Sequence, residues 1–138
     1  NQTISGTKTF SSFPVTPSTT PTTNYQVANK KYVDDSSLGV GQNVTLFGSL
    51  ERVANTVYTN TTNRTIFVSV TAAVPPDSQG EARVELYVDG IIVSANGGGE
   101  GLTARSVFAC ASFPVPAWST YTVSGLLAGQ IHRWIELR

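Results

Sequence analysis

Residues 83–95 read Arg83-Val-Glu-Leu-Tyr-Val-Asp-Gly-Ile-Ile-Val-Ser-Ala95, and this stretch decides the fold class. Every second residue from Val84 to Val88 is aliphatic, which places these side chains on one face of a strand. Asp89-Gly90 follows, and both residue types tolerate the positive φ angles of a two-residue type I′ turn. A second apolar run, Ile91–Ala95, comes directly after it. The pattern predicts an antiparallel β-hairpin.

Further strand patterns lie on both sides of this hairpin. Arg64–Val74 is the longest, and Pro75-Pro76 ends it. The glycine run Gly97–Gly101 is expected to form a flexible loop. Short strands separated by turn residues at these intervals predict an antiparallel β-sandwich or jelly roll over residues 42–138. The remaining predicted strands are Val44–Phe47, Val53–Tyr58, Arg105–Phe113, Ser119–Ser124 and His132–Leu137.

Residues 1–41 have a different character and are expected to form an extended arm followed by one short helix. Prolines recur among Ser and Thr between residues 14 and 21, which favours extended conformations and excludes a helix there. Thr23 and Gln26 have the spacing of a capping box, which predicts the start of the helix. Gly39 stands where a left-handed C-terminal cap is expected to end it. The chain also begins at Asn1 without Met, so we expect a processed product or a piece of a longer protein.

This arm and helix predict assembly. Phe10 and Phe13 are apolar but find no apolar partner within the arm itself. Tyr25, Ala28 and Tyr32 fall at i, i+3 and i+7, which forms one stripe on a helix. A solitary helix of this length is marginal in water. We therefore expect these five residues to lie in an interface between copies of the chain.

Composition narrows the classes of function. Nine basic and nine acidic residues balance, and charged residues make up only 13% of the chain, against about 25% in average domains. No run of Lys and Arg forms an electrostatic footprint for nucleic acid. No apolar run approaches the roughly 20 residues that span a bilayer. The sequence thus predicts no nucleic-acid partner and no membrane insertion, and its 18 Thr and 14 Ser suit an exposed β surface.

Few residues in the chain suit catalysis. Cys110 is the only cysteine and lies in an apolar run, so we expect a buried side chain without redox chemistry. His132 is the only histidine, and we expect a structural role for it because no nucleophile motif accompanies it. Glu81 and Glu85 flank a strand start, and a glycosidase pair at these positions stays open. We predict no cofactor, no metal and no enzymatic activity.

Several polar and aromatic residues in predicted loops are candidates for recognition, because loops on a rigid sandwich often carry binding. The glycine run is either a mobile tip or a ligand contact. Trp118 suits stacking on a sugar ring, although packing in the core or at a subunit interface is the alternative. The candidate receptor-binding residues are Tyr58, Asn60, Asn63, Asn96, Glu100 and Trp118.

Two segments resemble the tail fibre proteins of tailed bacteriophages. The first is Gln2-Thr-Ile-Ser-Gly-Thr-Lys-Thr-Phe10, a proline-containing spacer and Val27-Ala-Asn-Lys-Lys-Tyr-Val-Asp-Asp35, which is similar to shaft-to-tip segments. The second, Phe113–Val123 together with Trp134–Arg138, is similar in type to the small C-terminal domains of such fibres. An Acinetobacter phage is one candidate source.

The resemblance implies a parallel homotrimer in the virion, at the distal end of a tail fibre. The helix is then a three-stranded bundle, and the β-domain is a tip that binds a polysaccharide or lipopolysaccharide of the host without catalysis. Upstream fibre or baseplate proteins are the other implied partners. Two alternatives stay open: a fragment of a capsular polysaccharide depolymerase, and a purely structural trimerisation domain.

Overall fold

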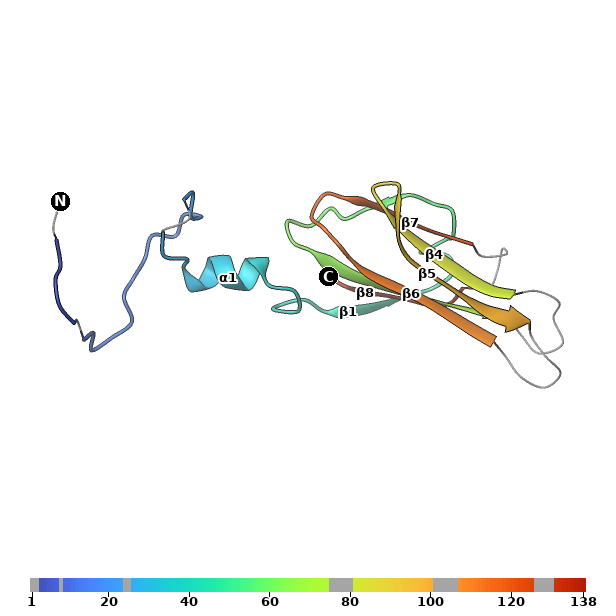
Figure 1. The fold of residues 1–138 in the computed structure, drawn as a ribbon, viewed down its shortest axis with the longest axis horizontal. Helices are drawn as coiled ribbons and strands as arrows, with labels where there is room; N and C mark the ends of the chain where they lie inside the picture. Colours follow the sequence, from blue (N-terminus) through green and yellow to red (C-terminus); the bar gives the residue numbers. More distant parts are fainter. Residues whose placement is uncertain (1–2, 8, 24–25, 75–80, 101–106, 126–130) are drawn as a thin grey trace.

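The computed structural model describes residues 3–7, 9–23, 26–74, 81–100, 107–125 and 131–138. Within these residues the chain forms one short helix and eight strands (Figure 1). In chain order the elements are α1 (Lys30–Ser36), β1 (Val44–Phe47), β2 (Tyr58–Thr59), β3 (Ile66–Val74), β4 (Glu81–Val88), β5 (Ile91–Glu100), β6 (Val107–Val115), β7 (Thr120–Ser124) and β8 (Ile131–Leu137).

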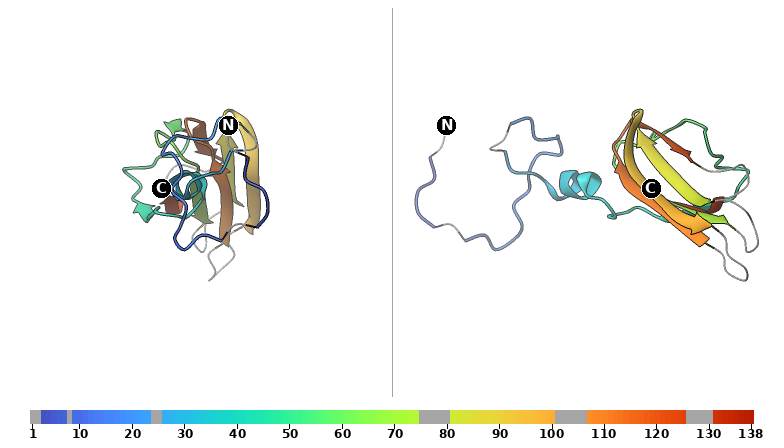
Figure 2. Two further views of the ribbon diagram at one scale, coloured as in Figure 1. Left: turned by 90° about the vertical axis from the view of Figure 1, so that its left-hand side faces the viewer. Right: turned by 45° about the vertical axis from the view of Figure 1, so that its right-hand side comes forward.

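The strands form two four-stranded antiparallel sheets that pack face to face, which confirms the predicted sandwich (Figures 1 and 2). Sheet A has the order β1-β8-β3-β6, and sheet B has the order β2-β7-β4-β5. Successive strands therefore alternate between the sheets, except for the hairpin β4–β5. This order is the connectivity of an eight-stranded jelly roll with two Greek keys.

Alternating side chains of the central strands make the core. On β3 every second residue from Ile66 to Val74 is fully buried, and on the facing strand β4 Val84 and Leu86 are fully buried. Tyr121 and Trp134, on β7 and β8, are the largest buried side chains. The period-two pattern of the sequence therefore points these residues between the sheets.

The predicted hairpin is confirmed, but its second strand is longer than expected. Asp89 and Gly90 have φ angles of 49° and 78°, as a type I′ turn requires. Residues Gly97–Glu100, expected to be a loop, continue β5, where Gly97 pairs with Arg83 and Glu100 with Glu81. Pairing with β4 overrides the weak strand preference of glycine in this position.

The predicted strand Val53–Tyr58 is wrong in all but its last residue. Only Tyr58–Thr59 pairs, as β2, with β7. The preceding residues form a loop along the edge of the sandwich, where the Asn55 amide donates to the Val123 carbonyl at 2.8 Å and the Val53 amide donates to the Tyr58 hydroxyl at 2.7 Å. Asn55 also has a φ of 60°, which a regular strand does not permit.

The helix starts later than the capping box predicts. Gln26 Oε1 does accept from the Thr23 amide at 3.3 Å, but the helix begins only at Lys30. Its N-cap is Asn29, whose Oδ1 accepts from the amide of Tyr32 at 2.8 Å. Gly39 is not the C-cap either: the helix ends at Ser36, and Gly39 lies in the following turn with a φ of 92°.

This later start removes the predicted helical stripe. Ala28 precedes the helix, Tyr25 lies outside the described residues, and only Tyr32 belongs to α1. Two i,i+4 ion pairs, Lys30–Asp34 and Lys31–Asp35, lie along this helix.

The described part of residues 3–23 forms neither a helix nor a strand, and it extends away from the sheets at one end of the jelly roll (Figures 1 and 2). Phe13 and Val15 are 96% and 98% exposed, and Phe10 is also exposed. We call the end of the jelly roll from which residues 3–43 extend the arm end. Gln42 ties the chain to it by donating to the Thr65 carbonyl at 2.8 Å.

The outer face of sheet A holds both residues singled out for their reactivity. Cys110 is exposed, not buried, because it falls on the outward phase of β6. Its sulfur lies 3.8 Å from the hydroxyl oxygens of Ser69 and Thr71. His132 sits at an irregularity in the pairing of β3 with β8, where it is exposed, and its ring lies edge-on to Phe108 with centroids 5.3 Å apart.

Candidate functional site

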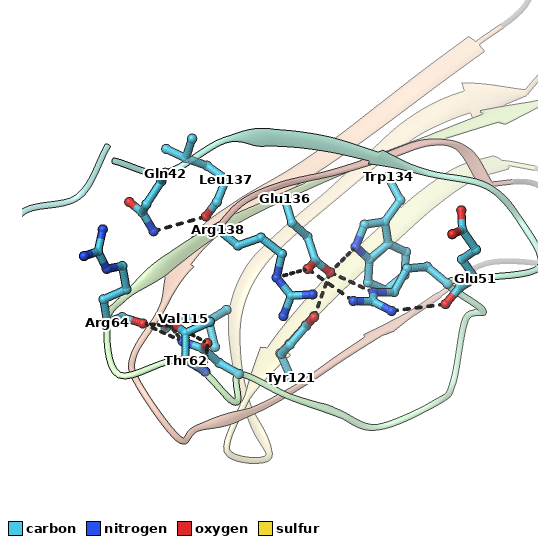
Figure 3. Close-up of polar contacts among 12 residues, drawn as sticks. Gln42, Glu51, Thr62, Arg64, Val115, Tyr121, Trp134, Glu136, Leu137 and Arg138 are labelled. Atoms are coloured by element: carbon cyan, nitrogen blue, oxygen red, sulfur yellow. Dashed lines mark hydrogen bonds and ion pairs between the residues drawn. The ribbon is translucent and has the colours of Figure 1, made fainter. Parts of the chain in front are cut away.

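A fully buried carboxylate, Glu136, is the strongest polar feature of the interior (Figure 3). Its Oε1 accepts from Tyr121 Oη at 2.7 Å, from Arg52 Nε at 2.8 Å and from Trp134 Nε1 at 3.0 Å. Its Oε2 lies 3.3 Å from both Arg52 and Arg138. These four partners come from the β1–β2 loop, β7, β8 and the C-terminus, so one side chain joins both sheets and two peripheral segments.

The electrostatics of this cluster favour a permanent charge. Burial opposes ionisation of Glu136, but hydrogen bonds from Arg52 and Tyr121 and the charges of Arg52 and Arg138 outweigh it and hold the pKa of Glu136 below its usual value. Burial and the adjacent carboxylate raise the pKa of Tyr121 far above its usual value. Glu136 is therefore a saturated acceptor with no exposed surface, which suits a structural role and not proton transfer to a substrate.

Aromatic rings enclose the arginine of this cluster. The Arg52 guanidinium carbon lies 4.0 Å from the centroid of the Phe47 ring and 4.6 Å from that of Tyr58. Tyr58 in turn packs against Tyr121 and Trp134, with ring centroids 5.8 and 5.7 Å away. Tyr58, a candidate receptor contact in the sequence, is thus part of the packing around Arg52 and is only half-exposed.

Asn60 is a second structural residue that the sequence singled out for recognition. It is fully buried, and its Nδ2 donates to the carbonyls of Arg64, Val115 and Pro116 at 2.9, 3.1 and 2.9 Å. Its Oδ1 accepts from the amide and hydroxyl of Thr62. The side chain joins the β2–β3 and β6–β7 connections and has no surface left for a receptor. We therefore no longer include Asn60 among the receptor contacts.

Trp118 differs from both because it is 67% exposed and has a φ of 66°. Positive φ is uncommon for any residue with a side chain and is strained for a bulky one. The hydrogen bond from its amide to the Asn60 carbonyl, at 2.9 Å, holds the backbone in this conformation. The exposed indole at the arm end is therefore attached to a strained backbone conformation.

A cleft of about 370 Å³ lies beside Trp118, between α1 and the jelly roll. Asn63, a candidate receptor contact, and Tyr32, a candidate trimer contact, both line it. Arg64 crosses it: the guanidinium lies 3.2 Å from Asp35 on α1 and donates to the Val40 carbonyl at 2.6 Å. Asp35 also pairs with Lys31 at 2.6 Å, and the hydrogen bond from Lys31 is the main reason that the pKa of Asp35 lies below its usual value. These contacts explain how α1 is held against the jelly roll.

The outer face of sheet B carries a polar cluster around Glu85, the one member that the sequence analysis had named; Glu85 itself is 8% exposed. Arg83, Glu85 and Tyr87 occupy alternate positions of β4, and Ser124 of β7 pairs with Glu85. Glu85 accepts from Tyr87 Oη at 2.8 Å, from Ser124 Oγ at 3.2 Å and from the Arg83 guanidinium. The hydrogen bonds from Tyr87 and Arg83 lower the pKa of Glu85. Only alternation on β4 signalled this cluster, because Ser124 is 39 residues away.

This cluster has the groups that a polar ligand needs. The Arg83 side chain is 62% exposed, so its guanidinium keeps free donors outside the pair with Glu85. Tyr87 is half-exposed and offers a ring face, while Thr122 and Ser124 place hydroxyl groups beside it on β7. Arginine in such a position can bind a carboxylate or phosphate with two parallel hydrogen bonds.

The six candidate receptor residues do not form one site. Tyr58, Asn60, Asn63 and Trp118 belong to connections at the arm end. Asn96 is exposed and pairs with Val84 in the middle of β4, and Glu100 pairs with Glu81 at its far end. The arm end lies at Val88, and Glu100 lies beside Glu81 at the other end of β4. At 3.3 Å per residue, the candidates at the arm end are therefore up to about 23 Å from those on β5. The side chain of Glu100 is outside the described residues.

The acids near β4 do not have the spacing of a glycosidase pair. Glu81 and Glu85 project from the same face four residues apart, or about 13 Å along the strand, whereas catalytic carboxyl groups stand roughly 5–9.5 Å apart. Glu136 faces the interior, so sheet B separates it from Glu85. Among the described residues, no three His, Cys, Asp or Glu side chains gather in a way that could hold a metal ion.

The described part of the chain contains no helix long and apolar enough to cross a membrane. No protein-family model matches this chain, and no curated protein matches it.

Proposed function

We propose that this chain is the distal part of a bacteriophage tail fibre, which attaches the virion to a polysaccharide or lipopolysaccharide of the host cell as a homotrimer without catalysis. In this proposal residues 1–41 connect the tip to upstream fibre or baseplate proteins and hold three copies together. The jelly roll, residues 42–138, presents the receptor-binding surface. The resemblance of residues 2–35 to shaft-to-tip segments supports the bacteriophage setting.

The observation that carries the proposal is the exposure of the arm. Its apolar side chains, among them Phe13 and Val15, have almost no contact with the rest of the described chain. Burying a Val or Phe side chain is worth about 1.5–3 kcal/mol, so a segment with several such residues gains most of its order from partners outside itself. Assembly with other copies supplies those partners.

In this proposal, the surfaces that meet the host follow from the direction of the arm. If upstream fibre joins the arm end, Asn63 and Trp118 face the shaft, and the opposite end of the jelly roll faces the cell. The outer face of sheet B runs between these ends and remains accessible. We therefore assign the receptor contact to Arg83 and Tyr87; Asn96, on the edge strand β5, pairs with the inward-facing Val84 and does not belong to this outer face. Three copies in one trimer multiply a weak contact through effective concentration.

Binding of the fluorescently labelled full chain to a panel of capsulated and O-antigen-bearing bacteria, and to their polysaccharide-deficient derivatives, tests the proposal. We expect binding to some strains and its loss when the polysaccharide is absent. Arg83→Ala should weaken this binding about tenfold or more, because a hydrogen bond to a charged group is worth about 1.5–3 kcal/mol. Arg133→Ala, an exposed arginine on sheet A, is the matched control.

Equal loss in both arginine variants would place the receptor contact elsewhere, and a chain that binds no strain at all would contradict adsorption. The purified polysaccharide should keep its length during incubation. Shortening that disappears in a Glu81→Gln or Glu85→Gln variant would favour a depolymerase.

A further inference from the structure

The exposed large hydrophobic residues of the jelly roll are concentrated on its two lateral edges. Within the described residues, the central strands β8, β3, β7 and β4 contribute none, and Trp118 is the single exception outside the edges. The β1 edge comprises strand β1 and the loop after it, and its exposed residues are Val44, Leu46, Leu50, Val53 and Val57. The β5–β6 edge comprises those two strands, and its exposed residues are Ile91, Ile92, Phe108 and Phe113.

The sheet orders place these edges on opposite sides of the sandwich. Strands β1 and β2 begin the two sheets, and strands β6 and β5 end them. The first side is closed by Arg52, which contacts the rings of Phe47 on β1 and Tyr58 on β2. The second is closed where the Ser112 amide of β6 donates to Ser94 Oγ of β5 at 3.2 Å.

Both edges have only part of the protection that edge strands usually have. Natural proteins place charged residues on exposed edge strands to prevent pairing with other chains. Residues 44–47, 91–97 and 107–115 contain no charged residue, and the protective residues of these edges are Glu51 and Arg52 in the loop after β1, Glu100 at the end of β5 and Pro114 in β6. Uncharged stretches of this length in edge strands favour coverage by another chain.

The arrangement selects a type of symmetry. A two-fold contact joins the same patch on both copies, so it covers one edge and leaves the other exposed. A head-to-tail contact joins two different patches, and it forms a ring when the rotation closes. The second arrangement covers both edges of every copy with one kind of contact, whereas two-fold symmetry needs a separate contact for each edge.

The amount of apolar surface fits such a contact. Side chains on the β1 edge are 48–97% exposed, and those on the β5–β6 edge are 36–68% exposed. At roughly 60–120 Å² for an aliphatic side chain and 150–250 Å² for an aromatic one, each edge offers about 200–400 Å² of apolar surface. The two together offer about 400–800 Å², and the upper part of this range matches the roughly 700 Å² of non-polar area in an interface of about 1,200 Å².

We propose that the β1 edge of one copy packs against the β5–β6 edge of the next copy in a closed head-to-tail ring. This inference rests on the homotrimer of the proposed function and identifies the surfaces that join its tip domains. Strand register gives the relative height: Leu46 pairs with Ile135, Ile135 with Ser69, and Ser69 with Ser112. In a ring whose axis follows the long axis of the molecule, Leu46 therefore lies at the height of the neighbour's Ser112, and Phe113, the next residue, is the nearest exposed apolar residue of that strand.

Cysteine crosslinking of the full chain tests this contact. Cys110→Ser first removes the single native thiol. Leu46→Cys chains and Phe113→Cys chains are then denatured, mixed, refolded together and treated with a short thiol-to-thiol crosslinker. We expect crosslinked pairs in the mixture and none in either variant alone. Phe108→Cys, mixed with Leu46→Cys, is the matched control, because Phe108 lies five residues, or about 17 Å, from Phe113 along β6.

Other outcomes overturn the inference in distinguishable ways. Crosslinking of Leu46→Cys chains to one another would indicate a two-fold contact. A trimeric mass in solution without any crosslink would show that residues 1–41 alone hold the copies together. A monomeric mass would refute both this contact and the homotrimer of the proposed function. A crosslinked trimer that binds no host strain would keep the edge contact and refute adsorption.

Discussion

Removing the buried carboxylate Glu136 is expected to destabilise the jelly roll strongly. Glu136→Ala leaves five donors without an acceptor: two from Arg52 and one each from Tyr121, Trp134 and Arg138. Removing one partner of a buried pair typically costs about 3–5 kcal/mol. Arg52 and Arg138 keep some exposure and can be hydrated in part, so we expect a loss near the lower limit, about 3 kcal/mol.

Urea or thermal unfolding followed by circular dichroism measures this loss. A chain of 138 residues changes its Tm by about 3–5 °C per kcal/mol, so Glu136→Ala should lower Tm by roughly 10 °C. Protein concentration must be the same for all variants, because assembly stabilises the folded state by mass action. Glu136→Gln, which keeps the shape and one acceptor, should lose less, about 1–3 kcal/mol.

The pH dependence of stability separates the contribution of the Glu136 charge from that of the shape of its side chain. The pKa of Glu136 is lower in the folded protein than its ordinary value of 4.5, so its charge contributes stability above that value. This contribution disappears as the pH falls through the folded-state pKa. The advantage of the wild type over Glu136→Gln should therefore shrink in acid. A pH-independent difference, or a loss under 1 kcal/mol in Glu136→Ala, would refute this account.

Three further experiments test the structural assignments made above. Asn60→Ala removes three hydrogen bonds to backbone carbonyls and should lower the free energy of unfolding, measured in urea, by about 3 kcal/mol. The control Asn63→Ala, at an exposed position, should lower it by less than about 0.5 kcal/mol. Similar losses in the two variants would contradict the anchoring role of Asn60. Trp118→Gly should leave stability unchanged or raise it by about 1 kcal/mol, because glycine adopts positive φ without strain, and a large loss would mean that the indole packs within the chain. Cys110 should react with a thiol reagent in the native protein, and protection up to the unfolding transition would show that a partner covers this face.

Local sequence patterns predicted most of the strands. The strand at Val44–Phe47 and the turn at Asp89-Gly90 have the expected bounds, and the other strands shift by a few residues, except for Val53–Tyr58, of which only Tyr58 belongs to a strand. The strand that was predicted to end at Phe113 continues through Pro114 to Val115, because β6 is an edge strand in which the missing amide costs no ladder hydrogen bond. Gly97–Glu100 joined a strand for a related reason: the partner strand β4 decides the conformation there.

The helix boundary depended on a choice between two start signals. Gln26 reaches back to Thr23 as a capping box requires, and three residues later Asn29 caps α1. Asn29 is also held by its Nδ2, which donates to the Pro17 carbonyl at 2.9 Å. This contact with the arm lies twelve residues away, so no local pattern favours the second signal over the first.

The Glu136 cluster was only partly accessible to sequence reasoning. Trp134 and Glu136 have the same phase on β8, so an acid on the inward face was visible. Its partner Arg52 is 84 residues away and directly precedes the segment that was predicted to be the strand Val53–Tyr58. Periodicity assigns a side chain to a face, but it does not identify which distant charge meets it.

Alternation between the two ends of the jelly roll explains why the predicted receptor residues separate. In an antiparallel fold of this order, successive connections alternate between the ends. The connections β2–β3, β4–β5 and β6–β7 lie at the arm end, and they contain Asn60, Asn63 and Trp118. The strands β3, β5 and β7 finish at the opposite end. Residues chosen for polar or aromatic character alone therefore mix surfaces that lie up to about one strand length apart. Under the proposed function the arm joins one of these ends to a fibre, so we expect the receptor contact at the other end or on the outer face of sheet B.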